Sequence, residues 1–316
     1  MNKARLAHII LWIALVALVM THLGLGENGM SLFGTITDNQ KLIFLQFRLP
    51  KILAAISAGM AISVSGLLMQ SYFRNPLAGP FVLGVSSGAS LGVAIYLLGA
   101  SVFPFLAAIG KIGLIGSALL GAMLVMLVVL YSSYRTGNSA NLLVIGIMWA
   151  SLTSALVGIL EFFAGATQIK FFLIWSMGSL LNVGLADSII IWACIVPGLL
   201  SALYLAKKLD IILLGRDYAM SMGVNYKQIS LFLFLITCVL AGVTTAFVGP
   251  IAFLGLAVPH FARAWLQSNT HKKLIYYCCL LGAVFLLSCQ LLCEYLLPNS
   301  TLPINLITSL IGAPVV

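Results

Sequence analysis

Apolar segments with the length of a membrane-spanning helix recur along nearly the whole chain, and polar residues gather in short stretches between them. A helix needs about 20 residues to cross the hydrocarbon core of a bilayer. Measured against that length, the pattern predicts about ten transmembrane helices. We expect them at residues 6–25, 52–70, 81–102, 112–131, 142–160, 185–206, the two halves of 229–266, 274–293 and 303–316.

Two segments depart from this regular pattern. Residues 171–181 are apolar but too short for a full crossing, which suits a re-entrant or interfacial helix. Residues 229–266 are apolar over nearly two crossings, and Gly249-Pro250 is expected to divide them into two helices. A similar Gly79-Pro80 follows the second span, which runs in the opposite direction to the seventh. The pattern therefore predicts an all-α membrane protein, one domain over 1–316, with inverted-repeat character.

Composition excludes a soluble fold. The chain has 316 residues, of which 62% are hydrophobic and only 7% charged. Too few polar side chains are present to cover a water-exposed surface of that size. The start, Met1–Arg5 followed by an apolar run, resembles a signal peptide, but no small-x-small cleavage site follows it. We therefore expect an uncleaved first helix.

The positive charges sort by membrane side. With ten spans, one side receives five basic and five acidic residues, and the other receives the remaining 11 basic and two acidic ones. The positive-inside rule places the basic side in the cytoplasm. We therefore expect a multi-pass protein of the cell (inner) membrane with both termini cytoplasmic. The net charge of +9 is spread between apolar runs and makes no continuous basic face, so we expect no nucleic-acid partner.

The sequence shows no catalytic or nucleotide-binding motif. It lacks a Walker loop and an HExxH motif, its cysteines form no CxxC, and we expect no metal or cofactor. The four histidines, at 8, 22, 260 and 271, lie near span ends and are expected to be interfacial side chains. All seven acidic residues lie in loops or near span ends, whereas carriers driven by protons or sodium usually need an acid at mid-membrane. Energy is therefore expected to enter from outside the membrane, through a cytoplasmic partner.

Two alternatives stay open from the residues alone. An ion-coupled secondary transporter of a small metal chelate would need a mid-membrane acid that is essential for transport. An intramembrane enzyme would need a nucleophile paired with a base inside the spans.

Three connecting segments are richer in information than the rest. Residues 48–51 place two cations at the mouth of the second span, where an ordinary interfacial anchor is the simpler interpretation. Residues 74–80 hold two prolines and a glycine, which predicts a rigid turn. Residues 207–227 form a long cytoplasmic loop that keeps a helical apolar pattern, which favours a partner-docking element over a solvated connector.

Glycines recur at every fourth position near the start of the third span. Gly84, Gly88 and Gly92 form a double GxxxG pattern, which lets another helix approach closely. A substrate path is the other interpretation, but tight helix packing is the more usual role of such patterns.

Motifs spread along the chain in order point to one family. They are Arg48-x-Pro50-Lys51, Arg74-Asn75-Pro76-Leu77-Ala78-x-Pro80, Leu83-Gly84, Trp175-x-x-Gly178-Ser179, Leu214-Gly215, Gly249-Pro250 with Pro259-His260-x-x-Arg263, and Leu310-Ile311-Gly312-Ala313-Pro314. With them the chain resembles the FecCD-type permeases, the membrane subunits of ABC importers for iron-siderophores, haem and cobalamin. A ferric siderophore is the cargo we expect by default, with haem and cobalamin as the other choices.

The resemblance also implies partners and roles. It implies ten helices per subunit, a second copy of the chain (a homodimer), two cytoplasmic ATPase subunits and an external substrate-binding protein. Arg48 and Lys51 would dock the binding protein. The expected cytoplasmic gate consists of Asn75, Leu77 and Ser139, and the expected ATPase-coupling residues are Leu214, Gly215, Ala219 and Gly223. Further family-motif residues are Arg74, Pro76, Pro80, Pro259, His260 and Arg263.

The spacing of small residues in the loop 207–227 and one charge late in the ninth span add to this picture. Gly215, Ala219 and Gly223 are spaced four apart, which predicts one narrow helix face that seats in a cleft of the ATPase. Family members commonly carry an acid and then an arginine late in the ninth span, where this chain has Gln290 and Glu294. Glu294 therefore reverses a charge on the expected outer face.

Overall fold

The computed structural model describes residues 3–24, 38–81, 84–99, 109–136, 139–266, 270–296 and 301–315, and in these ranges the chain is helical with no strand. The helices are α1 (Lys3–Gly24), α2 (Asp38–Ile43), α3 (Leu49–Phe73), α4 (Val85–Gly99), α5 (Gly110–Thr136), α6 (Ser139–Phe163), α7 (Ala166–Ser176), α8 (Leu185–Ile212), α9 (Arg216–Ser221), α10 (Tyr226–Thr237), α11 (Val243–Val248), α12 (Leu254–Leu266), α13 (His271–Tyr295) and α14 (Ile304–Gly312). Two π-helical segments, η1 (Phe44–Arg48) and η3 (Cys238–Gly242), join α2 to α3 and α10 to α11, and a 3-10 turn, η4 (Ala313–Val315), follows α14.

The ten predicted spans all become helices, but they differ in length. Within the described residues, seven helical segments are long and apolar enough to cross a bilayer: 6–24, 41–73, 110–132, 144–163, 185–212, 226–248 and 271–295. The other three predicted spans correspond to α4, α12 and α14, with 15, 13 and 9 residues. The prediction of a multi-span helical protein is confirmed, whereas the count of ten complete crossings stays a prediction.

Several predicted boundaries were wrong, for local reasons. Residues 48–51 were expected in a loop, but the chain is helical from Asp38 through Phe73. Pro50 does not end this helical path: it lies just after the π-helical segment at 44–48, and Arg48 and Leu49 keep right-handed helical backbone angles. The short helix expected at 171–181 is α7, which begins five residues earlier and ends before Gly178, a residue with φ of 72°.

The predicted loop 207–227 is shorter than expected. Helix α8 continues to Ile212, because its lysines at 207 and 208 lie exposed on the helix surface while Leu205, Ala206 and Leu209 are buried. The connection therefore spans residues 213–225 and contains one helix, α9. The predicted division at Gly249 is confirmed, since α11 ends at Val248 and α12 begins at Leu254.

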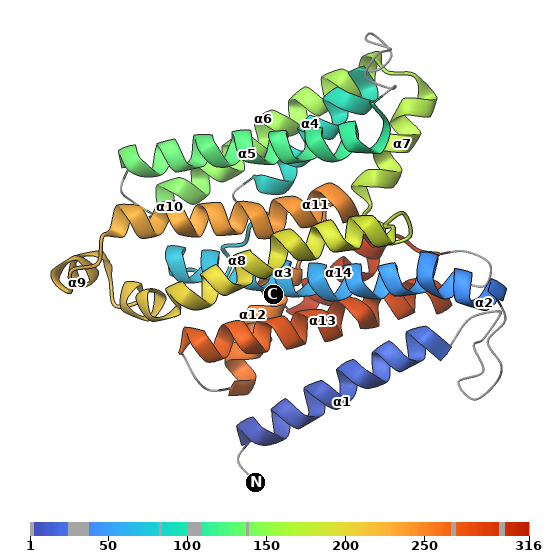
Figure 1. The fold of residues 1–316 in the computed structure, drawn as a ribbon. Coiled ribbons are helices and arrows are strands. Elements are labelled where there is room, and N and C mark those ends of the chain that lie inside the picture. The colour runs from blue at the N-terminus through green and yellow to red at the C-terminus, as the bar shows by residue number, and fades with distance from the viewer. Residues whose placement is uncertain are drawn as a thin grey trace.

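Helix α3 forms the centre of the bundle. It is buried along nearly its whole length and packs against α8, α12 and α13. Glycines permit these crossings: a Cβ added to Gly66 would stand 1.8 Å from the carbonyl oxygen of Gly255, and one added to Gly59 would stand 2.3 Å from that of Gly282. The backbones of the crossing helices touch at these points, as small-residue contacts in membrane helices allow. In Figure 1, α3 lies in the middle of the bundle, with α4–α7 on one side of it and α1 and α13 on the other.

The GxxxG prediction was right about packing. On α4, Gly88 and Gly92 face Gly121 and Ser117 of α5, and an added Cβ would stand 2.5 Å or less from a backbone oxygen of those residues. The double glycine pattern therefore serves as a helix contact.

The two ends of the bundle differ in charge. The end where α3 and α8 finish and α13 begins carries Arg74, Lys207, Lys208, Arg216, Lys272 and Lys273, and we call it the basic end. The opposite end carries Lys51, Lys111, Asp187 and Glu294, and we call it the mixed end. In Figure 1 the basic end lies at the left, where α9 projects, and the mixed end lies at the right, near α2. Gly79-Pro80 follows α3 at the basic end and Gly249-Pro250 follows α11 at the mixed end, which is the arrangement that an inverted repeat requires.

Candidate functional site at the basic end of the bundle

A tight, non-helical turn follows α3. Its first residue, Arg74, has left-handed backbone angles (φ 49°, ψ 37°), and the next N–H, that of Asn75, donates to the Gln70 oxygen at 3.1 Å. The side-chain oxygen of Asn75 accepts from the N–H of Leu77 at 3.0 Å, and its carbonyl accepts from the N–H of Ala78 at 3.1 Å. The turn is thus held by its own hydrogen bonds, as its prolines and Asn75 predict.

A polar chain ties three helix ends together beside this turn. His271, at the start of α13, is 1% exposed. Its Nδ1 lies 2.6 Å from Oδ1 of Asp210 on α8, and its Nε2 lies 2.7 Å from Oγ of Ser71 on α3. The backbone N–H of residue 271 donates to the same Asp210 oxygen at 2.9 Å. All four histidines were expected to be interfacial side chains. His271 is instead buried with a partner for each ring nitrogen, and His22 is also buried, with its Nε2 3.1 Å from the Leu287 carbonyl oxygen.

This serine–histidine–aspartate arrangement raises the question of catalysis. The Ser71 hydroxyl lies 2.7 Å from the Leu67 carbonyl oxygen one turn earlier, and Ser71 is 1% exposed. Acyl transfer needs free donors that stabilise an oxyanion beside the nucleophile. Ser71 instead lies in the last turn of α3, where backbone N–H groups are used by the helix. The arrangement therefore serves as a structural tie between α3, α8 and α13.

A cavity of about 320 Å³ opens beside the tie. It is lined by Gln70, Ser71, Arg74, Asn75, Pro76, Leu213, Arg263, His271 and Leu274. Arg263 of α12 donates from Nη1 to the side-chain oxygen of Gln70. Two arginines that are far apart in the sequence, Arg74 and Arg263, thus face one cavity, and no carboxylate is among the residues that line it.

The loop with α9 lies against the same turn. A Cβ added to Gly215 would stand 3.6 Å from Nη1 of Arg74, so the guanidinium of Arg74 lies near the residue that precedes α9. Gly215 and Gly223 have positive φ values of 118° and 77°, which glycine adopts without strain. The turn after α3 and the segment predicted to couple to an ATPase therefore lie close together, and Arg74 and Leu213 line the same cavity.

The predicted narrow face of α9 does not face outward. Ala219 is fully buried against its own chain, and its carbonyl accepts from the N–H of Val224 at 3.0 Å. The outer surface of this loop is formed by larger side chains, with Leu214 64%, Tyr218 53% and Met222 54% exposed. The expectation that the face with Ala219 enters a partner cleft was wrong, because that face is already packed.

At the mixed end, the two cations expected to dock a binding protein both have partners within the chain. Nη1 of Arg48 donates to the carbonyl oxygen of Leu23 at 2.5 Å. Nζ of Lys51 lies 2.7 Å from Oε1 of Glu294, and that oxygen also accepts from Nε2 of Gln290 at 2.6 Å. Both side chains of the ion pair are less than one-fifth exposed. Glu294 thus neutralises Lys51, which explains why the reversed charge is tolerated.

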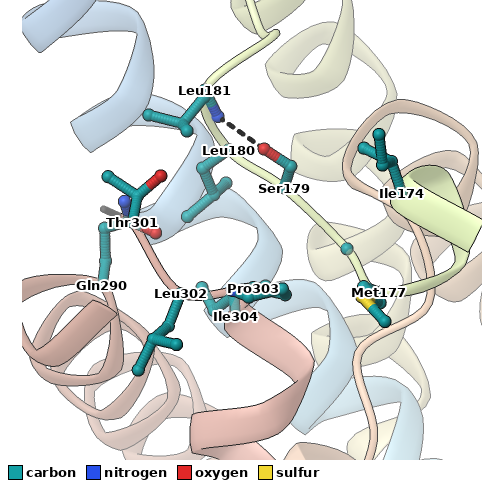
Figure 2. A pocket seen from close by; sticks show the side chains of 11 residues that line it. Ile174, Met177, Ser179, Leu180, Leu181, Gln290, Thr301, Leu302, Pro303 and Ile304 are labelled. Carbon is teal, nitrogen blue, oxygen red and sulfur yellow. Dashed lines mark hydrogen bonds between the residues drawn. The ribbon is translucent and has the colours of Figure 1, made fainter. Parts of the chain in front are cut away.

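A second cavity, of about 240 Å³, also lies at the mixed end (Figure 2). It is enclosed by the segment after α7, the end of α13 and the start of α14; Figure 2 shows Met177, Ser179, Gln290, Thr301 and Pro303 around it. The N–H of Asn305 donates to the Met177 carbonyl at 3.2 Å, which joins α14 to the segment after α7. Most of the residues that line the cavity are apolar.

The sequence pattern of the FecCD transport family matches residues 7–316. The chain belongs to this family. The hemin transport system permease protein of Yersinia pestis is 34% identical, over 99% of this chain and 96% of that protein. The vitamin B12 import system permease protein of Shigella boydii is 33% identical, over 95% of this chain and 90% of that protein. A solved structure described as an inward-facing, metal-chelate type ABC transporter has a TM-score of 0.88 and 27% identity, over 97% and 96% of the two chains.

For a FecCD permease, the structure gathers motif residues that the sequence scatters. At the basic end it brings Arg74, Pro76 and Arg263 to one cavity, while Pro259 is buried inside α12 and His260 is exposed. Pro80 is buried and lies close to Gly255 of α12. These motif residues thus lie either in the turn after α3 or on α12.

The expected gate residues are only partly brought together. Asn75 and Leu77 lie in one turn, and Leu77 is 55% exposed. Ser139 begins α6, and its side chain lies outside the described residues, as does Leu83 of the family motif. The grouping of these three residues as a gate stays a prediction.

Sequence reasoning missed Gln70, Ser71 and Asp210 as partners at the basic end. Gln70 ends the predicted span 52–70, Ser71 lies just beyond it, and Asp210 was expected in the loop 207–227, so nothing in the pattern singled them out. A usable signal existed, because polar side chains at the end of an apolar helix are costly to bury without partners. That signal says that partners exist but not which residues they are.

Proposed function

We propose that this chain is the membrane-spanning permease subunit of an ATP-binding-cassette importer that carries a metal chelate into the cytoplasm. The family match over residues 7–316 carries this proposal. Relatives named as hemin and vitamin B12 permeases, each covered over nearly their full length, support the class of cargo. The chain itself performs no catalysis in this proposal, and a separate ATPase subunit supplies the energy.

The contact between Arg74 and the α9 loop supports a route for coupling. We infer that a partner ATPase docks on the outer surface of this loop, where Leu214, Tyr218 and Met222 are exposed. Movement of the loop would reach the turn at residues 74–80 through Arg74 and Gly215, and Ala219 would hold α9 against the chain. A rigid, packed contact of this kind can transmit a displacement, whereas a solvated loop cannot.

The charge difference between the two ends supports an orientation. We propose that the basic end faces the cytoplasm, following the positive-inside rule, with both termini on that side of the inner membrane. The mixed end would then meet an external substrate-binding protein, with Arg48 as its more available cation, because Lys51 is paired with Glu294. A second copy of the chain would complete the translocation path.

The cargo is the least constrained part of the proposal. A ferric siderophore stays our working prediction within a class that also contains haem and cobalamin. Relatives associated with haem and with vitamin B12 are 34% and 33% identical, so identity does not choose between these ligands.

Reconstituted transport tests the proposal directly. The permease would be placed in proteoliposomes with its ATPase and binding protein, and uptake of a ferric siderophore, haem and cobalamin would be followed with and without ATP. Uptake of one chelate that needs ATP is expected. Uptake by the permease alone, driven by a proton or sodium gradient, would instead establish the secondary-transporter alternative.

A further inference from the structure

Arg263 is a partly buried cation without a carboxylate partner among the described residues. The ion pairs of lysine with a carboxylate present there are Lys51–Glu294 and Lys111–Asp187, and Asp210 is hydrogen-bonded to His271. The acceptor for Arg263 is the neutral amide oxygen of Gln70. Withdrawing a charged group from water is costly unless an opposite charge compensates it, so the position calls for an anion.

The space for such an anion lies directly beside the guanidinium. The cavity of about 320 Å³ next to Arg263 has roughly ten times the ~30 Å³ that one water molecule occupies in the liquid. Arg74 also lines this cavity, and within the described part of the chain its guanidinium donates no hydrogen bond. The nearby acid Asp210 is hydrogen-bonded to His271 and forms no ion pair with either arginine.

The surroundings increase the attraction for an anion. Lys207 and Lys208 on α8, Lys272 and Lys273 on α13, and Arg216 on α9 are all exposed at the same end of the bundle. Basic pockets between transmembrane helices at a membrane surface attract the head groups of anionic lipids. Arginine also suits a phosphate group, because its planar fork of N–H donors can bind two oxygens at once.

We propose that the cavity between Arg74 and Arg263 binds a phosphate group, supplied either by the head group of an anionic phospholipid or by free phosphate. The bound group neutralises Arg263 and spans the turn after α3 and the C-terminal part of α12. Because Arg74 also lies near Gly215, and Leu213 lines the same cavity, occupancy of the cavity favours one position of the α9 loop. This site is independent of which chelate the permease carries.

Native mass spectrometry of the purified full chain tests the lipid source. The protein would be stripped of lipid and then offered phosphatidylglycerol and phosphatidylcholine. The wild type is expected to retain about one phosphatidylglycerol in preference to phosphatidylcholine. Arg74→Gln and Arg263→Gln should each weaken that retention by roughly tenfold to a hundredfold, the range for one charge-assisted hydrogen bond. Lys170→Gln, which removes an exposed cation of α7 outside the cavity lining and outside the basic end, is the matched control and should change little.

A second arm uses inorganic phosphate with the lipid-stripped protein. A rise in melting temperature with phosphate but not with chloride, lost in both arginine variants, would identify the free ion as an occupant. Arg263→Lys keeps the charge and should retain part of the response even if Arg263→Gln fails to fold. The proposal is overturned if the folded arginine variants bind both probes as the wild type does. It is also overturned if the wild type binds neither probe and Arg263 pairs with a carboxylate of the ATPase subunit in the assembled complex.

Discussion

The tie between Asp210, His271 and Ser71 gives the sharpest test of how the basic end is held together. Replacing His271 by alanine removes two side-chain interactions, at 2.6 Å to Asp210 and at 2.7 Å to Ser71. It leaves Asp210 with the backbone N–H of residue 271, and Ser71 with the Leu67 carbonyl. The ends of α3 and α8 then lose their link through α13.

The expected loss of unfolding free energy depends on whether each of the two removed hydrogen bonds involves a charged group. A hydrogen bond to a charged group contributes about 1.5–3 kcal/mol and a neutral one about 1 kcal/mol. The Asp210 side chain is 36% exposed, so water compensates part of its loss and the lower half of that range applies. We therefore expect His271→Ala to lower the free energy of unfolding by about 2–4 kcal/mol. The coupling energy between His271 and Asp210 should be about 1–2 kcal/mol.

Equilibrium unfolding in detergent micelles would measure these quantities for His271→Ala, Asp210→Ala and the double variant. His8→Ala is the matched control, because the ring of His8 makes one bond, of 2.7 Å, to the Tyr276 hydroxyl at the surface of the same helix. His8→Ala should lower the free energy of unfolding by less than about 1 kcal/mol. A coupling energy below about 0.5 kcal/mol, or a loss for His271→Ala no greater than for His8→Ala, would refute the tie.

Three further predictions concern packing, the mixed end and the α9 loop. Gly59→Ala should lower the melting temperature strongly, because its Cβ would stand 2.3 Å from a backbone oxygen, whereas Gly116→Ala, with nothing within 4 Å, should change it little; equal effects would contradict the packing. Lys51→Glu should destabilise the protein by placing two carboxylates together, and adding Glu294→Lys should restore most of the loss; no rescue would show that the pair does not form. Ala219→Trp should detach α9, raising protease cleavage there and abolishing ATP-driven transport, and normal uptake would argue against coupling through this loop.

The sequence was most informative where one physical constraint dominates. A bilayer requires long apolar helices, so the runs at 185–212 and 271–295 could be identified from hydropathy alone. The pattern failed at helix ends: α8 continues past the lysines at 207 and 208, because long cationic side chains can lie exposed on a helix surface while the opposite face stays buried. Hydropathy averages over both faces and does not register this.

Only the tertiary structure decided which polar residues meet. Arg74 and Arg263 belong to motifs that the sequence already assigns to one family, yet their common cavity depends on how α3 crosses α12. Gly215, Ala219 and Gly223 were expected to share one narrow face, but only Ala219 is packed, against its own chain, while Gly223 is exposed with nothing within 4 Å of an added Cβ. Spacing of four defines a face only where the helix includes all three residues, and α9 is Arg216–Ser221. The sequence by itself determined that the chain lies in a bilayer, where its long helices run and which family it belongs to, since these follow from local composition and ordered motifs. The buried tie and the cavity needed the fold, because contacts between residues some 200 positions apart are set by helix crossings that no local pattern encodes.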